Sequence, residues 1–539
     1  MRSFLSRHKF RIILFLLLVM AELLVNPIGD FPLNDDWAFG KSVRIWMEEG
    51  RFTIGNWGYM TLATHLLWGI LFTKVFGFSF TILRLSTLVS SLIGVLTLNR
   101  LIERLSNNQT LAFVASLTLL FNPVYFNLSN TYMTDVNFNT LLIVSVYLAY
   151  LYFQSNSKWY LLLLFFCSVA LVLLRQFGLV FPIAFVISAL FTQRRWLNIG
   201  LFSGVLILVL LCFKAYESYL KGIIPPDAGY KFSSGLGLTF KQSFDLFCYH
   251  FGLRYQSFFL FVMVMVSPLC VSLLMDSVTH TGRWKTLLIA LLSCYLTYHL
   301  LSGHRFFIGN VFESTMLGPE TFYESYFSKI RHNASEGFQW LAQMAIPVLC
   351  SISLFVVLVS IRFGFLTRGI RLSTNAPVFV LVFTLLTGYA GMLLLVPTYF
   401  DRYLLPMISF VLIVLLVKEK ASSTYQRVGG LVLFFWMFIS IAGTHDYLQW
   451  NRLRWQAYTD IKSEGIQPNK INGGFEVNCW DEGRESWWTN YTELNDYDYL
   501  IQFGPHQKLI PKKKSMFNRW LPWRQDSICS YRLNKNSIH

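Results

Sequence analysis

Residues 10–28 read FRIILFLLLVMAELLVNPI, an almost wholly apolar run that follows a basic N-terminal stretch. A run of this length is typical of a transmembrane helix, because crossing the hydrocarbon core of a bilayer takes about 20 apolar residues. Glu22, Asn26 and Pro27 stand where a signal peptide would have small residues for cleavage, which favours a retained anchor. The positive-inside rule then places residue 1 in the cytoplasm.

The composition of the chain also indicates a membrane protein. Of its 539 residues, 54% are hydrophobic and 17% aromatic, only 14% are charged, and the mean hydropathy is +0.47. An ordinary cytosolic enzyme is excluded, because soluble domains carry about 25% charged residues. The net charge of +16 fits either nucleic acid or anionic lipid, so its distribution along the chain has to decide.

Further apolar segments predict a mainly α-helical bundle of about 13 transmembrane helices. After the first, these segments are Ile82–Leu101, Leu111–Leu128, Phe138–Phe153, Trp159–Leu174, Phe177–Phe191, Trp196–Phe213, Phe258–Met275, Leu287–Leu301, Leu341–Ile361, Val378–Val396, Tyr403–Val417 and Val428–Ile441. With a cytoplasmic N-terminus, every predicted inner loop is basic. The surplus of positive charge therefore indicates how the chain is oriented in the membrane, and nucleic acid is excluded as a partner.

Two other regions complete the predicted organisation. Met60–Val75 is apolar enough to cross, but a crossing there would invert the charge pattern, so we expect an interfacial or re-entrant helix. The membrane domain covers residues 1–443, with an acidic first outer loop at 29–80. Residues 444–539 are more polar and close to charge balance, and we expect a small extracytoplasmic soluble α/β domain.

The tail contains the cysteines Cys479 and Cys529, which would face an oxidising compartment. A disulfide between them and two free thiols are both compatible with the sequence.

Adjacent carboxylates open the first outer loop, in the sequence Asn34-Asp35-Asp36-Trp37. Carboxylates just beyond a span can act as a general base or hold a cation. Alternatively, Asp36 only caps the helix expected at Trp37–Glu48.

Three more charged residues are expected on the same outer face. Asp135 precedes the fourth span and either caps that helix or joins Asp35 and Asp36 in one site. Arg175 lies in an outer turn, and Arg402 follows Asp401 at the start of a span. Each arginine either anchors its helix at the interface or binds a phosphate. Carboxylates and arginines that converge on one face predict an outward-facing active site.

Sequence motifs for metal or nucleotide binding do not accompany these residues. No His-x-x-x-His or Cys-x-x-Cys spacing is present, and no glycine-rich phosphate loop occurs. We expect His65, on the interfacial helix, to be a packed polar residue.

In this order, the motifs resemble the GT-C superfamily of integral-membrane glycosyltransferases. The resemblance is to its bacterial, family 39-like branch, which is related to protein O-mannosyltransferases and lipid A aminoarabinose transferases. The residues that carry it are Asn34-Asp35-Asp36-Trp37, 76–84, Met133-Thr134-Asp135, Arg175-Gln176-Phe177-Gly178, 402–406, and 445–455 with 473–478 in the tail.

The resemblance implies a sugar donor linked to polyprenyl phosphate and a site open to the extracytoplasmic side. It implies that Asp35 is the base for the acceptor hydroxyl, and that Asp36 and Asp135 shape the acceptor or charge environment. The residues expected to bind the donor phosphate are Arg175, Arg402 and Lys41.

This chain departs from the lipid A relatives at three motifs. It has Asp-Asp-Trp where they often have Asp-Glu-Pro, and Gly58-Tyr59-Met60-Thr61 where they have Glu-Lys-Pro-Pro, which removes a lysine that the relatives use near phosphate. It also has Arg175 where they tend to have lysine. The acceptor (a lipid, a glycan or a protein) and any need for a divalent cation therefore stay open.

A transporter or flippase of a lipid-linked sugar is the alternative from another class, and a receptor or assembly protein is a third. Transporters tend to show internal repeats or broken helices with charge at the midplane, whereas here the acidic residues gather at one interface. We expect a multi-pass enzyme of the bacterial cytoplasmic (inner) membrane.

Overall fold

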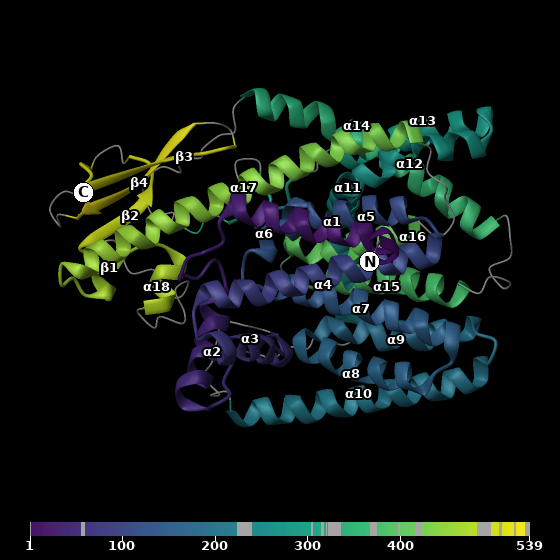
Figure 1. Ribbon diagram of the computed structural model, residues 1–539, viewed down its shortest axis with the longest axis horizontal. Coiled ribbons are helices and arrows are strands. Elements are labelled where there is room, and N and C mark those ends of the chain that lie inside the picture. Colours follow the sequence, from purple (N-terminus) through teal and green to yellow (C-terminus); the bar gives the residue numbers. More distant parts are fainter. Residues whose placement is uncertain are drawn as a thin grey trace.

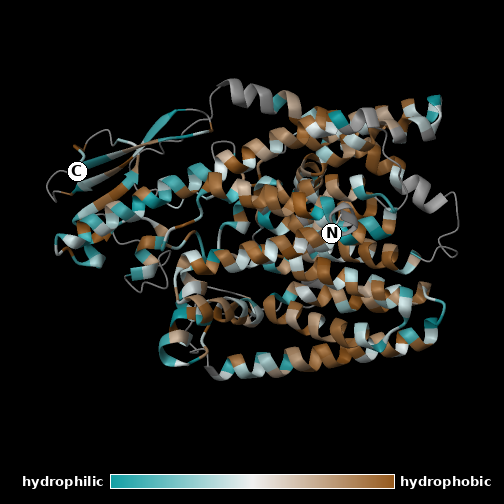
Figure 2. Ribbon diagram, viewed as in Figure 1, coloured by the Kyte–Doolittle hydropathy of each residue, from teal (hydrophilic) through white to brown (hydrophobic). Residues whose placement is uncertain are grey.

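A mainly helical bundle with a small sheet at one end forms the computed structural model (Figure 1). It describes residues 2–54, 60–223, 240–302, 306–313, 317–319, 321, 336–366, 375–396, 399–415, 423–481, 497–505, 509–521 and 524–533. Apolar residues cover the bundle, while the end that carries the sheet is more polar (Figure 2). The predicted architecture, a polytopic helical membrane protein with a small C-terminal sheet, is confirmed.

The helices of the described chain overlap every apolar segment predicted from the sequence. In chain order they are α1 (Arg2–Val25), α2 (Asp36–Glu49), α3 (Ala63–Phe76), α4 (Phe80–Ser106), α5 (Gln109–Leu120), α6 (Pro123–Ser129), α7 (Thr134–Ser155), α8 (Lys158–Leu174), η1 (Gln176–Leu179), α9 (Val180–Ser188), η2 (Ala189–Phe191), α10 (Arg195–Ile223), α11 (Phe240–Met265), α12 (Ser267–Thr281), α13 (Arg283–Leu301), α14 (Glu336–Leu366), α15 (Ala376–Leu394), η4 (Asp401–Leu404), α16 (Leu405–Leu415), α17 (Ser423–Ser463), η5 (Pro468–Lys470) and α18 (Phe475–Asp481).

Two segments predicted as single spans are bent helix pairs. The axes of α5 and α6 differ by 67°, and those of α11 and α12 by 66°. Proline causes both breaks, because its ring cannot donate the backbone hydrogen bond that continues a helix. At the first break the Asn122 side chain accepts hydrogen bonds from the backbone N–H groups of Val124 (3.0 Å) and Tyr125 (3.2 Å) and starts α6 at Pro123. Pro268 lies at the start of α12.

Seven helices of the described chain are long and apolar enough to cross a membrane, or up to nine if each bent pair is one span. The protein is therefore a multi-pass membrane protein, and the count of about 13 spans stays a prediction. α3 has only 14 residues, fewer than the roughly 20 needed to cross. That length fits the interfacial or re-entrant helix predicted at Met60–Val75.

A topology experiment follows from this arrangement. We expect a cysteine introduced at Glu48, the exposed end of α2, to react with a membrane-impermeant thiol reagent in intact cells. A cysteine at Arg283, the exposed first residue of α13, should react only after the cells are permeabilised. The reverse labelling pattern would contradict a cytoplasmic N-terminus.

The C-terminal region is joined to the bundle by one long helix. α17 has 41 residues, so it extends about 60 Å at 1.5 Å per residue, and in Figure 1 it runs from the bundle to the sheet. The four strands are β1 (Ile471–Asn472), β2 (Tyr499–Phe503), β3 (Lys513–Asn518) and β4 (Gln525–Arg532).

These strands form a mixed sheet in the order β1-β2-β4-β3. The β1–β2 pair is parallel and the other two pairs are antiparallel, with Ile501 opposite Ser530 in the β2–β4 pair. β4 is one of the two inner strands of the sheet, and its central residues are buried.

No disulfide joins Cys479 and Cys529. Both side chains are buried, but Cys479 of α18 belongs to the main hydrophobic cluster, while Cys529 of β4 belongs to a separate small cluster with Tyr531. Of the two alternatives left by the sequence, the structure has the one without a disulfide, and the two cysteines belong to different hydrophobic clusters.

Candidate active site

The segment between α1 and α2, residues 26–35, is held by the buried Arg84 of α4. Its guanidinium donates to the backbone carbonyl oxygens of Pro27 (3.0 Å), Gly29 (2.7 Å) and Phe31. The guanidinium also lies 4.6 Å from the centre of the Phe31 ring. Because one rigid fork of donors binds three backbone acceptors, the acidic loop has a fixed path.

Asp35 ends this segment, and its side chain points to Arg402. Its Oδ2 atom lies 3.2 Å from both Nη1 and Nη2 of Arg402, and the two side chains are only 14% and 6% exposed. Asp35 is the N-cap residue of α2, yet its side chain makes no capping hydrogen bond. The alternative in which Asp36 caps the helix is therefore wrong, since α2 begins at Asp36 itself.

Asp36 is buried at the start of α2, close to Arg84. Burial raises the pKa of the Asp36 carboxyl to about 8, and the backbone of Tyr132 and the charge of Arg84 oppose this rise only in part. A carboxyl group that keeps its proton at neutral pH is a poor general base, which favours Asp35 over Asp36 for that role.

This burial has a consequence for pH dependence. Folded Asp36 keeps its proton up to about pH 8, whereas the pKa of a free aspartate side chain is 3.8. Between these values the folded state binds more protons than the unfolded state, so stability should fall as the pH rises. In Asp36→Asn, we expect a smaller drop in the thermal unfolding midpoint between pH 6 and pH 8.5 than in wild type. Equal drops in the two proteins would contradict this assignment.

Asp135 and Arg175 form a second buried ion pair. Nη2 of Arg175 lies 2.7 Å from Oδ1 of Asp135, and the side chains are 5% and 1% exposed. Arg175 also donates from Nε (3.0 Å) and Nη2 (2.5 Å) to the hydroxyl of Thr134. Because Met133 is the N-cap residue of α7, Asp135 is not simply a helix cap, and its carboxylate is paired with Arg175.

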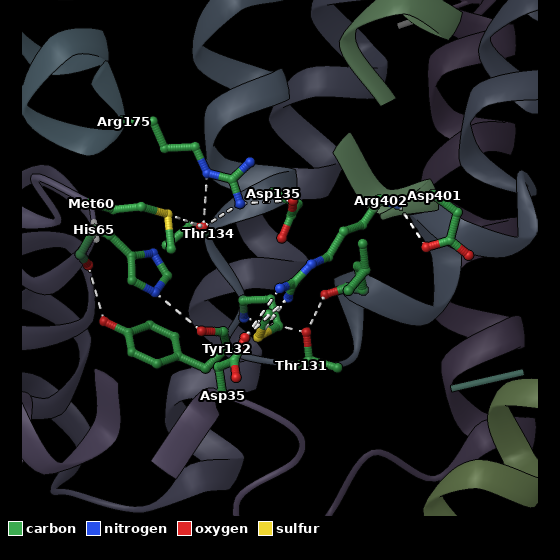
Figure 3. Close-up of polar contacts among 12 residues, drawn as sticks. Asp35, Met60, His65, Thr131, Tyr132, Thr134, Asp135, Arg175, Asp401 and Arg402 are labelled. Atoms are coloured by element: carbon green, nitrogen blue, oxygen red, sulfur yellow. Dashed lines mark hydrogen bonds and ion pairs between the residues drawn. The ribbon is translucent and has the colours of Figure 1, made fainter. Parts of the chain in front are cut away.

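The two ion pairs lie near each other (Figure 3), and both arginines lie close to the Tyr403 ring. The guanidinium carbon lies 5.6 Å from the centre of the Tyr403 ring in Arg175, and 5.4 Å from it in Arg402. The structure thus brings together Asp35, Asp135 and the two arginines, which come from four separate places in the sequence.

Asp401 positions Arg402 from the main-chain side. Its carboxylate accepts hydrogen bonds from the backbone N–H groups of Val311 (3.1 and 3.2 Å), Phe312 (2.6 Å) and Arg402 (2.7 Å). Burial raises the pKa of Asp401 to about 7, and these hydrogen bonds oppose the rise. Asp401 therefore joins η4 to the 311–312 segment and fixes the point from which Arg402 extends.

His65 is a packed polar residue, as the sequence predicts. It is fully buried, with Nε2 3.1 Å from the Tyr132 carbonyl oxygen and Nδ1 2.9 Å from Nδ2 of Asn137. Its ring stacks on Tyr132 at 4.2 Å, and the Tyr132 hydroxyl donates to the His65 carbonyl oxygen (3.0 Å). This network fixes the start of α7 and hence Asp135.

Tyr132, Thr134 and Tyr403 also belong to the site, although no role was predicted for them from the sequence. In the sequence, only their proximity to Asp135 or Arg402 suggested that they belong to the site.

Lys41 lies on α2, five residues after Asp36, and its role as a phosphate ligand stays a prediction. Among the described residues, no group of three or more His, Cys, Asp and Glu side chains could hold a metal ion.

The protein is therefore a multi-pass helical membrane protein, and its two buried ion pairs join residues that are far apart in the sequence. Residues 64–216 match the family described as dolichyl-phosphate-mannose-protein mannosyltransferase. The match runs from α3 into α10 and includes Asp135 and Arg175. It confirms the resemblance to this group of membrane glycosyltransferases. No curated protein matches the chain.

Solved structures give weaker likenesses. ArnT from Cupriavidus metallidurans bound to undecaprenyl phosphate is 11% identical, with a TM-score of 0.41 over 96% of this chain and 97% of that one. The archaeal oligosaccharyltransferase AglB from Archaeoglobus fulgidus, in complex with an inhibitory peptide and a dolichol-phosphate, is 13% identical, with a TM-score of 0.42 over 82% of this chain and 56% of that one. TM-scores this low do not by themselves establish a common fold.

Proposed function

We propose that this protein is a glycosyltransferase that moves a sugar from a polyprenyl-phosphate donor to an acceptor hydroxyl. The observation that carries the proposal is the pair of neighbouring ion pairs, Asp35–Arg402 and Asp135–Arg175. They supply what the reaction needs, which is a carboxylate for the incoming hydroxyl and fixed cations for the phosphate that leaves. The family match over residues 64–216 supports the same reaction class.

In the proposed reaction the Asp35 carboxylate takes the proton of the acceptor hydroxyl. The acceptor oxygen bonds to the anomeric carbon as the bond from that carbon to the phosphate oxygen breaks, and the electron pair leaves with the polyprenyl phosphate. A single displacement of this kind inverts the configuration at the anomeric carbon. Arg175 and Arg402 stabilise the growing charge on the leaving phosphate, with Lys41 as a third candidate.

The ion pairs also suggest how donor binding prepares the base. While Arg402 is bound to Asp35, its guanidinium occupies Oδ2 of the carboxylate. A donor phosphate is an equally good partner for a guanidinium fork. When the phosphate engages Arg402, Asp35 is released to receive the proton of the acceptor.

The proposed setting is the bacterial cytoplasmic membrane, with the N-terminus inside and the site open to the extracytoplasmic face. Residues 1–443 would form the catalytic membrane domain and residues 444–539 the extracytoplasmic domain. The partners are then the bilayer, the lipid-linked sugar donor and a lipid, glycan or protein acceptor. The prenyl chain of the donor can stay in the bilayer while its phosphate reaches the arginines.

A transfer assay with purified protein in liposomes tests this function. Radiolabelled sugars on polyprenyl phosphate are supplied together with membrane extract as the source of acceptor, and we expect label in the acceptor fraction with release of polyprenyl phosphate. The same liposomes without acceptor are tested for movement of intact labelled donor between leaflets. Movement without any transfer would contradict the proposal and favour a flippase.

A further inference from the structure

A second buried ionic cluster links the tail to the acidic loop. Nη2 of Arg454 on α17 lies 2.7 Å from Oε2 of Glu476 on α18, and both side chains are 0% exposed. Both are described residues of the tail, and neither belongs to the Asp35–Arg402 or Asp135–Arg175 pair. Burying two charges costs free energy that their mutual attraction often does not recover, so a role beyond stability has to be considered.

The other oxygen of Glu476 reaches the residue next to Asp35. Oε1 accepts a hydrogen bond from the backbone N–H of Asn34 (2.8 Å) and one from the Thr321 hydroxyl (2.7 Å). The Thr321 hydroxyl in turn accepts from Nη1 of Arg454 (3.0 Å). One carboxylate therefore ties together the first outer loop, residue 321 and the long helix α17.

The backbone at Asn34 makes this contact decisive for Asp35. Asn34 has a φ of 53°, in the left-handed region that non-glycine residues seldom adopt. Asn34 directly precedes Asp35, the N-cap residue of α2, whose side chain contacts Arg402. Asparagine adopts the left-handed region more readily than most residues, and the hydrogen bond from the Asn34 N–H to Glu476 fixes the backbone in it.

Packing of α18 against the start of α2 supports the contact. The Phe475 ring meets Trp37 edge-on, with ring centres 6.0 Å apart. The Trp480 ring lies 5.0 Å from that of Phe80 and beneath the guanidinium of Arg44, 4.5 Å away. These aromatic contacts place α18 firmly enough for Glu476 to act as a fixed acceptor.

We propose that Glu476, oriented by Arg454, is a positioning residue that holds the Asn34 backbone and thereby aims Asp35 at the reacting groups. The inference rests on the proposed function, because it assigns to the tail the alignment of the base in that reaction. Glu476 does not contact the substrate, and it acts through the main chain of the loop. The tail is thus part of the catalytic apparatus.

The test uses the full-length protein in lipid nanodiscs and compares Glu476→Ala and Glu476→Gln with wild type. The matched control is Asp481→Asn, on the same helix α18, where the partly exposed carboxylate pairs with Lys462 and accepts a hydrogen bond from the Tyr458 hydroxyl. One readout is hydrogen exchange in peptides that cover residues 30–40. The other is kcat and donor KM for sugar transfer, expressed per folded molecule.

In Glu476→Ala we expect faster exchange at residues 30–40 and a kcat about 10- to 100-fold lower, because a misplacement of about 1 Å costs that much. Donor KM should stay within about threefold, since the phosphate-binding arginines are untouched. Glu476→Gln should fall between this variant and wild type, because its amide oxygen still accepts from Asn34 but no longer pairs with Arg454. Asp481→Asn should match wild type in both readouts.

Unchanged exchange with a normal kcat per folded molecule in both Glu476 variants would overturn the inference and leave a structural role only. If Glu476→Ala does not fold, Glu476→Gln decides by the same two readouts. If wild type transfers no sugar, the proposed function fails, and exchange at residues 30–40 alone decides whether Glu476 holds the loop.

Discussion

Replacing Asp35 by asparagine should lower the rate of sugar transfer by about 10²–10⁴-fold, because an amide cannot take the proton of the acceptor hydroxyl. The change is nearly isosteric, and an asparagine at this position can still accept a hydrogen bond from Arg402, 3.2 Å away in wild type. We therefore expect normal folding and a donor KM close to that of wild type. The measurement is transfer from radiolabelled donor in liposomes, at saturating donor and acceptor.

The control for this prediction is Asp460→Asn on α17, where the carboxylate is 41% exposed and pairs with Lys513 at the surface. It makes the same chemical change away from the site and should keep wild-type turnover. If Asp35→Asn also keeps wild-type turnover, Asp35 is not the base, and the role must pass to another carboxylate of the cluster.

The second large effect is expected at Arg175. Replacing it by methionine leaves the Asp135 carboxylate buried without its partner, since the two side chains are 5% and 1% exposed. Breaking a buried ion pair in this way costs about 3–5 kcal/mol of unfolding free energy. Denaturant titration in detergent, followed by tryptophan fluorescence, measures the loss. A difference below about 1 kcal/mol would mean that the pair is not formed in solution.

Two controls separate this effect from general damage. In the double variant Arg175→Met, Asp135→Leu, neither charge of this pair is left buried without its partner, so most of the lost stability should return. Arg51→Met breaks an ion pair with Glu49 whose side chains are 61% and 51% exposed. It should change the unfolding free energy by no more than about 1 kcal/mol.

The sequence predicted the helices well and their breaks poorly. Apolar runs locate helices because a spanning segment must satisfy its backbone internally and cover itself with apolar side chains. The bends at Pro123 and near Pro268 were missed, although proline was visible in the sequence. Hydropathy averages over a window, so it does not register one missing hydrogen-bond donor.

Membrane topology predicted which residues share one face, but not which of them pair. Charge patterning put Asp35, Asp135, Arg175 and Arg402 on one face, and the structure brings these four together. Which carboxylate pairs with which arginine was beyond the sequence, because Asp35 and Arg402 are 367 positions apart. No local pattern specifies such a contact, and the packing of α2, α7 and η4 determines it.

The role of Glu476 was hidden for the same reason. Its motif, Gly473–Asn478, was noted only as part of a family resemblance, and a glutamate at the start of a short helix is usually a surface residue. Only the folded chain shows that Glu476 is buried and hydrogen-bonded to Asn34.

The contact between Asn34 and Glu476 also has a consequence for biogenesis. The two residues are 442 positions apart, and ribosomes add about 5–20 residues per second. Roughly 20–90 seconds therefore pass between synthesis of the acidic loop and synthesis of the carboxylate that fixes it. During this interval the loop lacks its hydrogen bond to Glu476. If Glu476 positions Asp35 as proposed, we expect chains that end before residue 476 to lack this anchor and to transfer no sugar.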